Sequence, residues 1–121
     1  MRGDKILVVD DSPVELRLVT AALTTGGYRV VTAVDGDDAM LKAIAEQPKL
    51  ILMDVVMPKK NGFQVCRTLK TNDETKNIPI VLLTSKNQDS DKFWGMKQGA
   101  DEYLTKPFDS EDLLATVARY T

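Results

Sequence analysis

The sequence lacks histidine altogether and contains a single cysteine, Cys66. The missing histidine excludes serine–histidine and cysteine–histidine catalysis, histidine-ligated metal sites and a phosphohistidine on this chain. Cys66 has no partner for an internal disulfide, which fits a reducing cytoplasm, and a buried apolar role is favoured over a reactive thiol. Any phosphate chemistry here must therefore depend on carboxylates.

Long apolar runs are also missing. No stretch approaches the roughly 20 residues that a membrane-spanning helix needs, and the N-terminus lacks the apolar region of a signal peptide. Sixteen Lys and Arg against eighteen Asp and Glu leave a net charge of −2, which provides no field that attracts nucleic acid or anionic lipid. We therefore expect a cytoplasmic protein with no nucleic-acid partner and no membrane insertion.

The composition that is present is that of an ordinary globular domain. A length of 121 residues and an apolar content of 43% suit one domain with one hydrophobic core. The last predicted helix ends where the chain ends. We therefore expect a single domain over residues 1–121, with no output domain and in a monomeric state.

Apolar runs at five places predict buried strands. They are Ile6–Val9, Val30–Val31, Leu50–Met53, Ile80–Leu83 and the weaker Tyr103–Leu104. Helical patterns separate these runs. The alternation predicts an α/β fold, a doubly wound five-stranded parallel sheet with five helices covering both faces.

The helices have recognisable ends and apolar faces. Ser12, Pro13 and Glu15 predict a helix start with a capping box, Gly26-Gly27 predicts its end, and Asp109 is predicted to cap the last helix. The fourth helix, about residues 90–97, has few apolar side chains. The residues predicted to face the core are Val14, Leu18, Ala22 and Leu23 in the first helix, Ala39, Met40, Ala43 and Ile44 in the second, Val65, Cys66 and Leu69 in the third, and Leu113, Leu114, Val117 and Ala118 in the last.

Polar side chains follow four of the predicted strands. Each lies at the carboxyl end of its strand, and together they are Asp10, Asp11, Asp54, Thr84 and Lys106. In an open parallel sheet, ligand crevices form at this edge. Residues spread over almost the whole chain are therefore predicted to meet in one pocket.

Three carboxylates in one crevice need a counter-charge, and a hard divalent cation such as Mg²⁺ suits all-oxygen ligands. We predict that Asp11 and Asp54 bind Mg²⁺, that Asp10 does so through water, and that the backbone carbonyl of Val56 completes the set. Asp54 is the predicted nucleophile and phosphate acceptor, since a carboxylate can form an acyl phosphate. Lys106 would neutralise charge on the phosphoryl group, and the Thr84 hydroxyl would donate to a phosphate oxygen.

Several of these residues have plainer interpretations. An aspartate after a strand is often only a helix cap, a threonine there is often a turn residue, and a lone lysine is usually solvated. The Lys106–Pro107 bond is trans by default, although a cis bond is cheap before proline. Gly62 and Gly99 fit either a close approach or positive φ, or a simple helix boundary.

The segments that carry these residues resemble a known family in order and spacing. They are ILVVDDSP, LILMDVVMPKKNGF, IPIVLLTSK and GADEYLTKPF, and they resemble the motifs of response regulator receiver domains such as the chemotaxis protein CheY. The resemblance implies a flavodoxin-like sheet of order 2-1-3-4-5. It also implies Mg²⁺-dependent phosphoryl transfer to Asp54 from a sensor histidine kinase of the CheA type, with Mn²⁺ able to substitute, and a cis peptide between Lys106 and Pro107.

The resemblance further implies a switch formed by Thr84 and Tyr103. On phosphorylation the hydroxyl moves toward the phosphate, the ring turns inward, and the surface of the fourth helix, fifth strand and fifth helix changes its affinity for a downstream protein. The stretch KNQDSDKFWGMKQGADEYLTKPF is most similar to PilH-type regulators of type IV pilus motility. Trp94 is either an exposed partner-binding anchor on this surface or a packing residue.

Positions 56 and 86 border the route of the water that attacks the acyl phosphate in this family. Val56 cannot orient that water, so we expect a phosphate lifetime different from that of CheY; Lys86 occupies the other position. The alternative functions are an aspartate-nucleophile phosphatase, a flavodoxin-like cofactor carrier, and a docking module that works without phosphorylation. Aspartate-nucleophile phosphatases usually have a second acid two residues after the nucleophile, and this sequence has Val56 there. A flavodoxin-like carrier would need a less acidic loop after the first strand than Asp10-Asp11.

Overall fold

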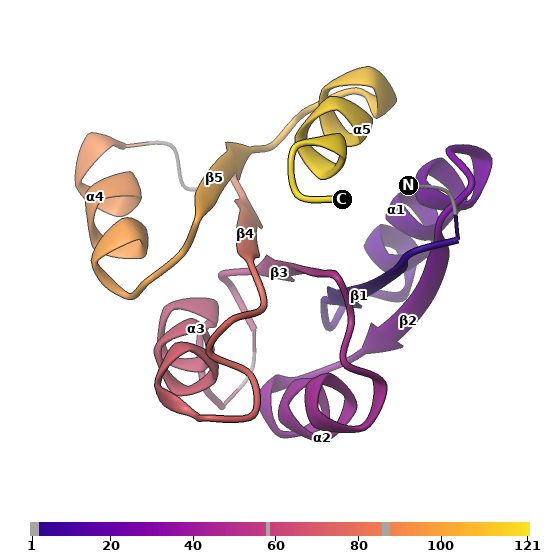
Figure 1. Ribbon diagram of the computed structural model, residues 1–121. Coiled ribbons are helices and arrows are strands. Elements are labelled where there is room, and N and C mark those ends of the chain that lie inside the picture. Colours follow the sequence, from indigo (N-terminus) through magenta and orange to yellow (C-terminus); the bar gives the residue numbers. More distant parts are fainter. Residues whose placement is uncertain (1–2, 58, 86–87) are drawn as a thin grey trace.

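The computed structural model describes residues 3–57, 59–85 and 88–121, and within them five strands alternate with five helices (Figure 1). The strands are β1 (Lys5–Val9), β2 (Arg29–Ala33), β3 (Leu50–Asp54), β4 (Ile80–Thr84) and β5 (Glu102–Thr105). The helices are α1 (Pro13–Thr25), α2 (Gly36–Glu46), α3 (Gly62–Thr71), α4 (Asp89–Lys97) and α5 (Ser110–Ala118). All ten predicted elements are present, with boundaries shifted by a few residues.

The strands form one sheet, in which every pairing is parallel. Its order is β2-β1-β3-β4-β5, which confirms the expected doubly wound arrangement. The strand order reverses at β1, which pairs with both β2 and β3. The crevice beside the carboxyl ends of β1 and β3 is the place where such sheets bind ligands.

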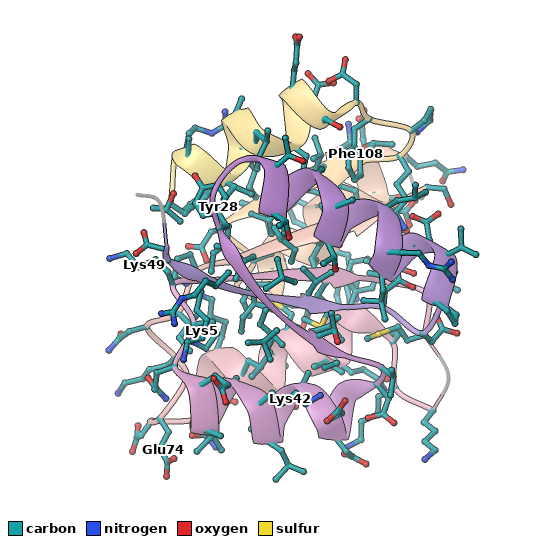
Figure 2. The ribbon with its side chains drawn as sticks, turned by 90° about the vertical axis from the view of Figure 1, so that its right-hand side faces the viewer. Lys5, Tyr28, Lys42, Lys49, Glu74 and Phe108 are labelled. Carbon is teal, nitrogen blue, oxygen red and sulfur yellow. The ribbon has the colours of Figure 1, made fainter. Side chains whose placement is uncertain are left out.

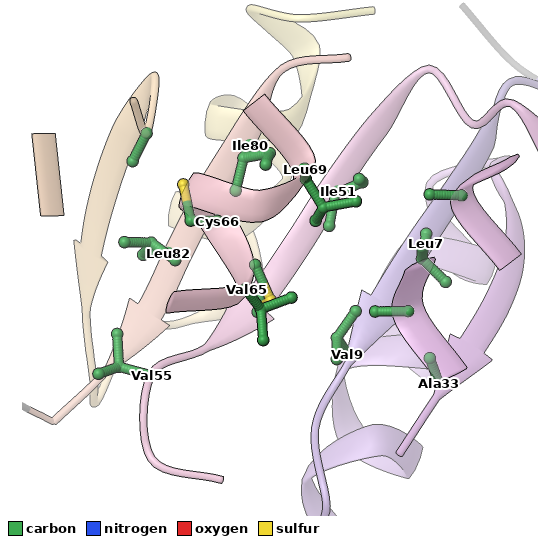
Figure 3. Close-up of a cluster of buried hydrophobic side chains, with 14 of the residues drawn as sticks. Leu7, Val9, Ala33, Ile51, Val55, Val65, Cys66, Leu69, Ile80 and Leu82 are labelled. Carbon is green, nitrogen blue, oxygen red and sulfur yellow. The ribbon is translucent and has the colours of Figure 1, made fainter. Parts of the chain in front are cut away.

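Two helical layers cover the sheet. Figure 1 shows α1 and α5 on one face and α2, α3 and α4 on the other. Figure 3 shows the core beneath α2 and α3, where side chains such as Leu7, Ile51, Leu69 and Ile80 are fully buried. The opposite core contains Ile6, Leu52, Leu113 and Val117.

Cys66 lies in the α3 core with no exposed surface, as predicted. Its Sγ is 3.7 Å from the carbonyl oxygen of Gln98, to which the thiol donates. Burial raises the pKa of this thiol to about 12. Cys66 is therefore a packing residue, because only the thiolate is reactive.

The predicted inner faces of three helices need correction. Val14 and Leu18 of α1 are 61% and 64% exposed, and Val19 is buried with Leu23 instead. Helix α1 has apolar residues around most of its circumference, so its periodicity alone does not select one face. The other errors concern Ile44 in α2 and Ala118 in α5, which are exposed. Met40 and Leu114 are partly buried and pack against the two cores, as predicted.

Polar and aromatic side chains cover an edge strand and part of the core. Lys42 of α2 donates from Nζ to the carbonyl oxygen of Thr32, at 2.6 Å, and so covers part of edge strand β2 (Figure 2). Tyr28 and Phe108, which lie at opposite ends of the α1–α5 layer in Figure 2, pack against the core beneath it. Of the helices described, none has the length and apolar character to cross a membrane.

Candidate functional site

Three carboxylates meet at the carboxyl edge of the sheet. Asp10 and Asp11 follow β1, and Asp54 is the last residue of the neighbouring strand β3. One carboxylate oxygen from each residue lies within 4.8 Å of the other two. Asp10 is buried, Asp54 is half-buried and Asp11 is exposed, so the cluster opens to solvent on one side.

The loop after β1 is stabilised by hydrogen bonds that its own side chains accept from the backbone. Asp10 Oδ1 accepts from the backbone N–H of Ser12 at 2.9 Å, and Ser12 Oγ accepts from the backbone N–H of Glu15 at 3.3 Å. Ser12 is therefore the N-cap of α1, as predicted, and Pro13 is in its first turn. The reciprocal half of the predicted capping box is wrong, since the Ser12 N–H is bound by Asp10 rather than by the Glu15 side chain.

Lys106 brings a positive charge to this cluster from the far side of the cleft. Its Nζ lies 3.5 Å from Asp10 Oδ2 and 3.4 Å from Glu15 Oε2, and its side chain is only 19% exposed. Its backbone N–H donates to the carbonyl oxygen of Thr84 at 2.8 Å, which ties it to β4. The peptide bond between Lys106 and Pro107 is cis.

Glu15 is the charged member of the site that the motif did not reveal. We assigned it to the capping box, whereas its carboxylate pairs with Lys106. The available signal was its position one turn into the helix that follows the acidic pair. A side chain there can point back over the carboxyl ends of the strands.

The electrostatics of the cluster leave the carboxylates short of positive charge. Burial raises the pKa of Asp54 above its ordinary value; Lys106 acts against this rise and the charge of Asp10 adds to it. Burial likewise raises the pKa of Asp10, although the Ser12 N–H and Lys106 act in the opposite direction. A further cation bound by these oxygens would relieve the repulsion.

The acids fit a hard divalent cation on the chemistry of their donor atoms. Three carboxylates that lie together and partly face solvent leave room for the water ligands that Mg²⁺ retains. Val56, whose carbonyl was the predicted fourth ligand, is in the same cleft. Its backbone N–H donates to Asp54 Oδ1 at 3.4 Å. The backbone of the loop after β3 therefore contacts the Asp54 carboxylate.

Gly62 determines how closely α3 approaches Asp54. A Cβ at Gly62 would lie 2.3 Å from the Asp54 carbonyl oxygen and 2.7 Å from the Cα of Val55. The Gly62 N–H donates to the Val55 carbonyl at 2.7 Å. Of the two interpretations left open by the sequence, close approach is the one that the structure supports at this position, while Gly99 adopts a positive φ of 98°.

The two residues of the predicted switch lie on neighbouring strands. Thr84 is buried at the end of β4 and lines the cleft, and Tyr103 is half-buried on β5. Burial, with smaller contributions from the charges of Asp91 and Asp54, raises the pKa of Tyr103 to about 12. Helix α4 contacts the Tyr103 ring through Gly95, where an added Cβ would lie 3.2 Å from the ring.

The cleft extends beyond the acids along a less polar wall, with a volume of about 930 Å³. Leu18, which was assigned to the core, lines this wall together with Ala22, Pro107 and Phe108. Val56 is 58% exposed at the cleft. Lys86, the other residue predicted to border the route of attacking water, lies outside the described residues.

Trp94 lies on the outer side of α4 rather than in the core. It is 53% exposed, and its neighbours Phe93 and Met96 are 65% and 48% exposed. Lys97 Nζ is 5.8 Å from the centre of the Phe93 ring. This geometry disfavours the packing role that the sequence left open for Trp94.

Comparison with known proteins agrees with the motifs and with the fold. The profile of the response regulator receiver domain family matches residues 6–118. Protein PilH of Pseudomonas aeruginosa is 49% identical over 93% of this chain and 93% of its own length. Several other relatives are longer, and the chain spans 47% of one and 26% of another.

Solved structures show the same fold. The chemotaxis response regulator CheY4 of Vibrio cholerae matches with a TM-score of 0.91 and 36% identity, over 98% of this chain and 99% of that one. The receiver domain of sensor histidine kinase PA1611 from Pseudomonas aeruginosa, solved with a magnesium ion coordinated in its active site cleft, matches with a TM-score of 0.90 and 31% identity, over 98% and 97% of the two chains. The chain belongs to the response regulator receiver domain family, with a CheY-like fold and PilH among its relatives.

Proposed function

We propose that this chain is a phosphorylation-operated switch in which Asp54 accepts a phosphoryl group from the phosphohistidine of a sensor kinase. The observation that carries the proposal is the meeting of Asp54 with Asp10, Asp11, Thr84 and Lys106 in one cleft. Membership in the receiver domain family supports a kinase as donor. A kinase of the CheA type fits the chemotaxis-like relatives.

The transfer itself requires positioning rather than an acid–base residue. A carboxylate oxygen of Asp54 attacks the phosphorus, the P–N bond of phosphohistidine breaks, and its electron pair stays on the imidazole, which takes a proton from water. The product is an acyl phosphate on Asp54. Lys106 reduces the negative charge on the transferring group, and the Thr84 hydroxyl donates to one of its oxygens.

Mg²⁺ is the cofactor that the acids suit best, and Mn²⁺ can replace it because it accepts the same oxygen donors. Asp11 and Asp54 would hold it directly, Asp10 through water, and Val56 through its carbonyl oxygen. Held by these residues, such an ion would supply charge neutralisation at the phosphoryl oxygens. The magnesium site of the PA1611 receiver domain supports this assignment.

The output of the switch would be the surface of α4, β5 and α5. Phosphorylation would draw Thr84 toward the phosphate and turn Tyr103 inward, and this changes the packing of α4 through Gly95. Trp94 is available to a downstream protein because it is exposed. The 49% identity with PilH supports a PilH-type regulator, and the proposed setting is signalling that controls type IV pilus motility. The proposal also includes a cytoplasmic, monomeric protein with no nucleic-acid or membrane partner, which rests on composition and charge.

The experiment that tests the proposal is intact-mass measurement after incubation with acetyl phosphate, with and without Mg²⁺. We expect one phosphoryl adduct on the wild type that requires Mg²⁺ and is absent from Asp54→Ala. Folded wild type that gains no adduct would instead support a docking module. Repeated release of phosphate from a small ester would support a phosphatase.

Val56 gives a second test of the same function. Its exposed apolar side chain at the cleft cannot hydrogen-bond a water near the acyl phosphate, whereas an asparagine amide can. We expect Val56→Asn to change the half-life of the phosphorylated protein after the donor is removed. An unchanged half-life would show that position 56 does not control the attacking water.

A further inference from the structure

Lys106 forms ion pairs with two carboxylates that come from different parts of the site. Asp10, at 3.5 Å, belongs to the acid cluster, whereas Glu15, at 3.4 Å, lies in the first turn of α1 and is not part of that cluster. The described ion pairs of Lys106 are these two, and neither is with Asp54. In the unphosphorylated structure, Lys106 is therefore paired with Asp10 and Glu15 rather than with the proposed acceptor.

Glu15 contributes little to the local fold through its carboxylate. Its backbone N–H is capped by Ser12 Oγ, a bond that does not involve the side chain. Its side chain is 41% exposed, and its charge in the first turn of α1 has only the small favourable effect of the helix dipole. The ion pair with Lys106 is thus the specific interaction that this carboxylate makes in the described part of the chain.

We propose that Glu15 is a positioning residue that holds Lys106 in the unphosphorylated state and competes with the phosphoryl group for it. The inference rests on the proposed function, because it concerns the same phosphoryl transfer. A phosphoryl group on Asp54 carries more negative charge than a single carboxylate, so it draws the ammonium away from Glu15. Asp10 is close enough to Asp54 to remain a neighbour of Lys106 throughout.

The competition has a definite sign. Lys106 lowers the barrier to phosphoryl transfer only when it reaches the transferring group, and part of that interaction is offset by leaving Glu15. Glu15→Gln removes the competitor and keeps the shape of the side chain. We expect acetyl phosphate to modify Glu15→Gln about two- to fivefold faster than wild type, which is the effect of a partly exposed ion pair.

Two further variants separate the contact from simple charge. Glu15→Asp keeps the negative charge but is one methylene shorter, so it loses contact with Lys106 and is expected to react faster than wild type. Glu111→Gln removes an exposed carboxylate from the first turn of α5 and is expected to react at the wild-type rate. Thermal unfolding of all variants checks that each is folded.

The rates are measured by intact mass under saturating Mg²⁺, with Asp54→Ala as the reference without an acceptor. An adduct on wild type that Asp54→Ala lacks would uphold the proposed function whatever the Glu15 variants do. A Glu15→Gln rate equal to or below that of wild type overturns the inference. So does a wild-type rate in Glu15→Asp, or an acceleration in Glu111→Gln that matches that of Glu15→Gln, because each would show that the contact is not the cause.

Discussion

Helices α3 and α4 cover the same face of the sheet but are attached to it in different ways (Figure 1). Helix α3 buries Phe63, Val65, Cys66 and Leu69, and a complete capping box between Asn61 and Gln64 closes its N-terminus. Among the described residues of α4, Gly95 alone is buried. The N-cap residue of α4, Gln88, makes no side-chain cap hydrogen bond. The large apolar side chains of α4 face outward instead.

The two helices therefore differ in how much buried apolar surface stabilises their packing on the sheet. Burying a large apolar side chain contributes about 1.5–3 kcal/mol, so α3 is held by several such contributions and α4 by few. Helix α3 also sets the position of Asp54 through Gly62, whereas α4 contacts the Tyr103 ring through Gly95. Asp54, the proposed acceptor, therefore lies against the well-packed helix, whereas the proposed output surface includes the helix with fewer buried side chains.

The largest expected effect concerns the apolar side chains of the two helices. Leu69→Ala in α3 removes a fully buried side chain and should lower the free energy of unfolding by about 3 kcal/mol. Met96→Ala in α4 removes a side chain that is 48% exposed and should change it by about 0.5 kcal/mol or less. Urea denaturation measures both, and similar losses would contradict the comparison.

A second contrast concerns the two glycines. Gly62→Ala places a methyl group against backbone atoms, so it should lower the free energy of unfolding by about 2 kcal/mol or more and slow the phosphorylation of Asp54. Gly95→Ala meets side-chain atoms at 3.1–3.2 Å, and a gain in helix propensity of about 1 kcal/mol offsets the crowding. Urea denaturation and intact-mass kinetics on both variants test this ranking of the two losses. A Gly62→Ala variant with wild-type stability and a wild-type phosphorylation rate would contradict it.

The helix caps should give a smaller difference. Asn61→Ala removes the half of the α3 capping box in which Asn61 Oδ1 accepts the Gln64 N–H at 3.0 Å. The other half, in which Gln64 Oε1 accepts the backbone N–H of residue 61 at 3.0 Å, does not need the asparagine side chain. We expect a loss of about 1 kcal/mol in the free energy of unfolding. Gln88→Ala at the start of α4 removes no cap hydrogen bond and serves as the matched control. If Gln88→Ala lowered the free energy of unfolding as much as Asn61→Ala does, the N-terminus of α4 would be shown to stabilise that helix.

The smallest effect on stability is expected at Trp94. Its truncation removes an exposed side chain, so Trp94→Ala should change the free energy of unfolding by about 0.5 kcal/mol or less and leave the rate of phosphorylation unchanged. Binding to the downstream protein should weaken, because exposed tryptophan is a frequent interface anchor. Unfolding of this variant at room temperature, seen by circular dichroism, would return Trp94 to a packing role.

Much of the fold followed from simple patterns. The five apolar runs became the five strands, and the polar residues placed after them lie together because carboxyl ends of parallel strands share one edge. The inner face of α1 did not follow, since Val14, Leu18, Val19 and Leu23 offer more than one apolar stripe and tertiary packing chooses among them. In α5, Thr116 is buried where Ala118 was expected, because its hydroxyl donates to the Asp112 carbonyl within the helix.

Most members of the site were predictable, but Glu15 and its contact with Lys106 were not. Asp10, Asp11 and Asp54 have few roles other than capping or ligation once they share an edge, so residue type and strand position were enough. Glu15 had a local interpretation as part of a capping box, which concealed its ion pair with Lys106, a residue 91 positions away. Such a pairing depends on the relative placement of α1 and the loop after β5, which one-dimensional periodicity does not contain.

The complete burial of Cys66 has a consequence for how this protein responds to oxidants. A thiol with a pKa of about 12 and no exposed surface has almost no thiolate at neutral pH, so it lacks the nucleophile that attacks peroxides and disulfides. Oxidative stress in the cell would then leave the sulfur atom of this side chain unchanged. In the proposed switch, phosphorylation of Asp54 would therefore not depend on the oxidation state of this cysteine.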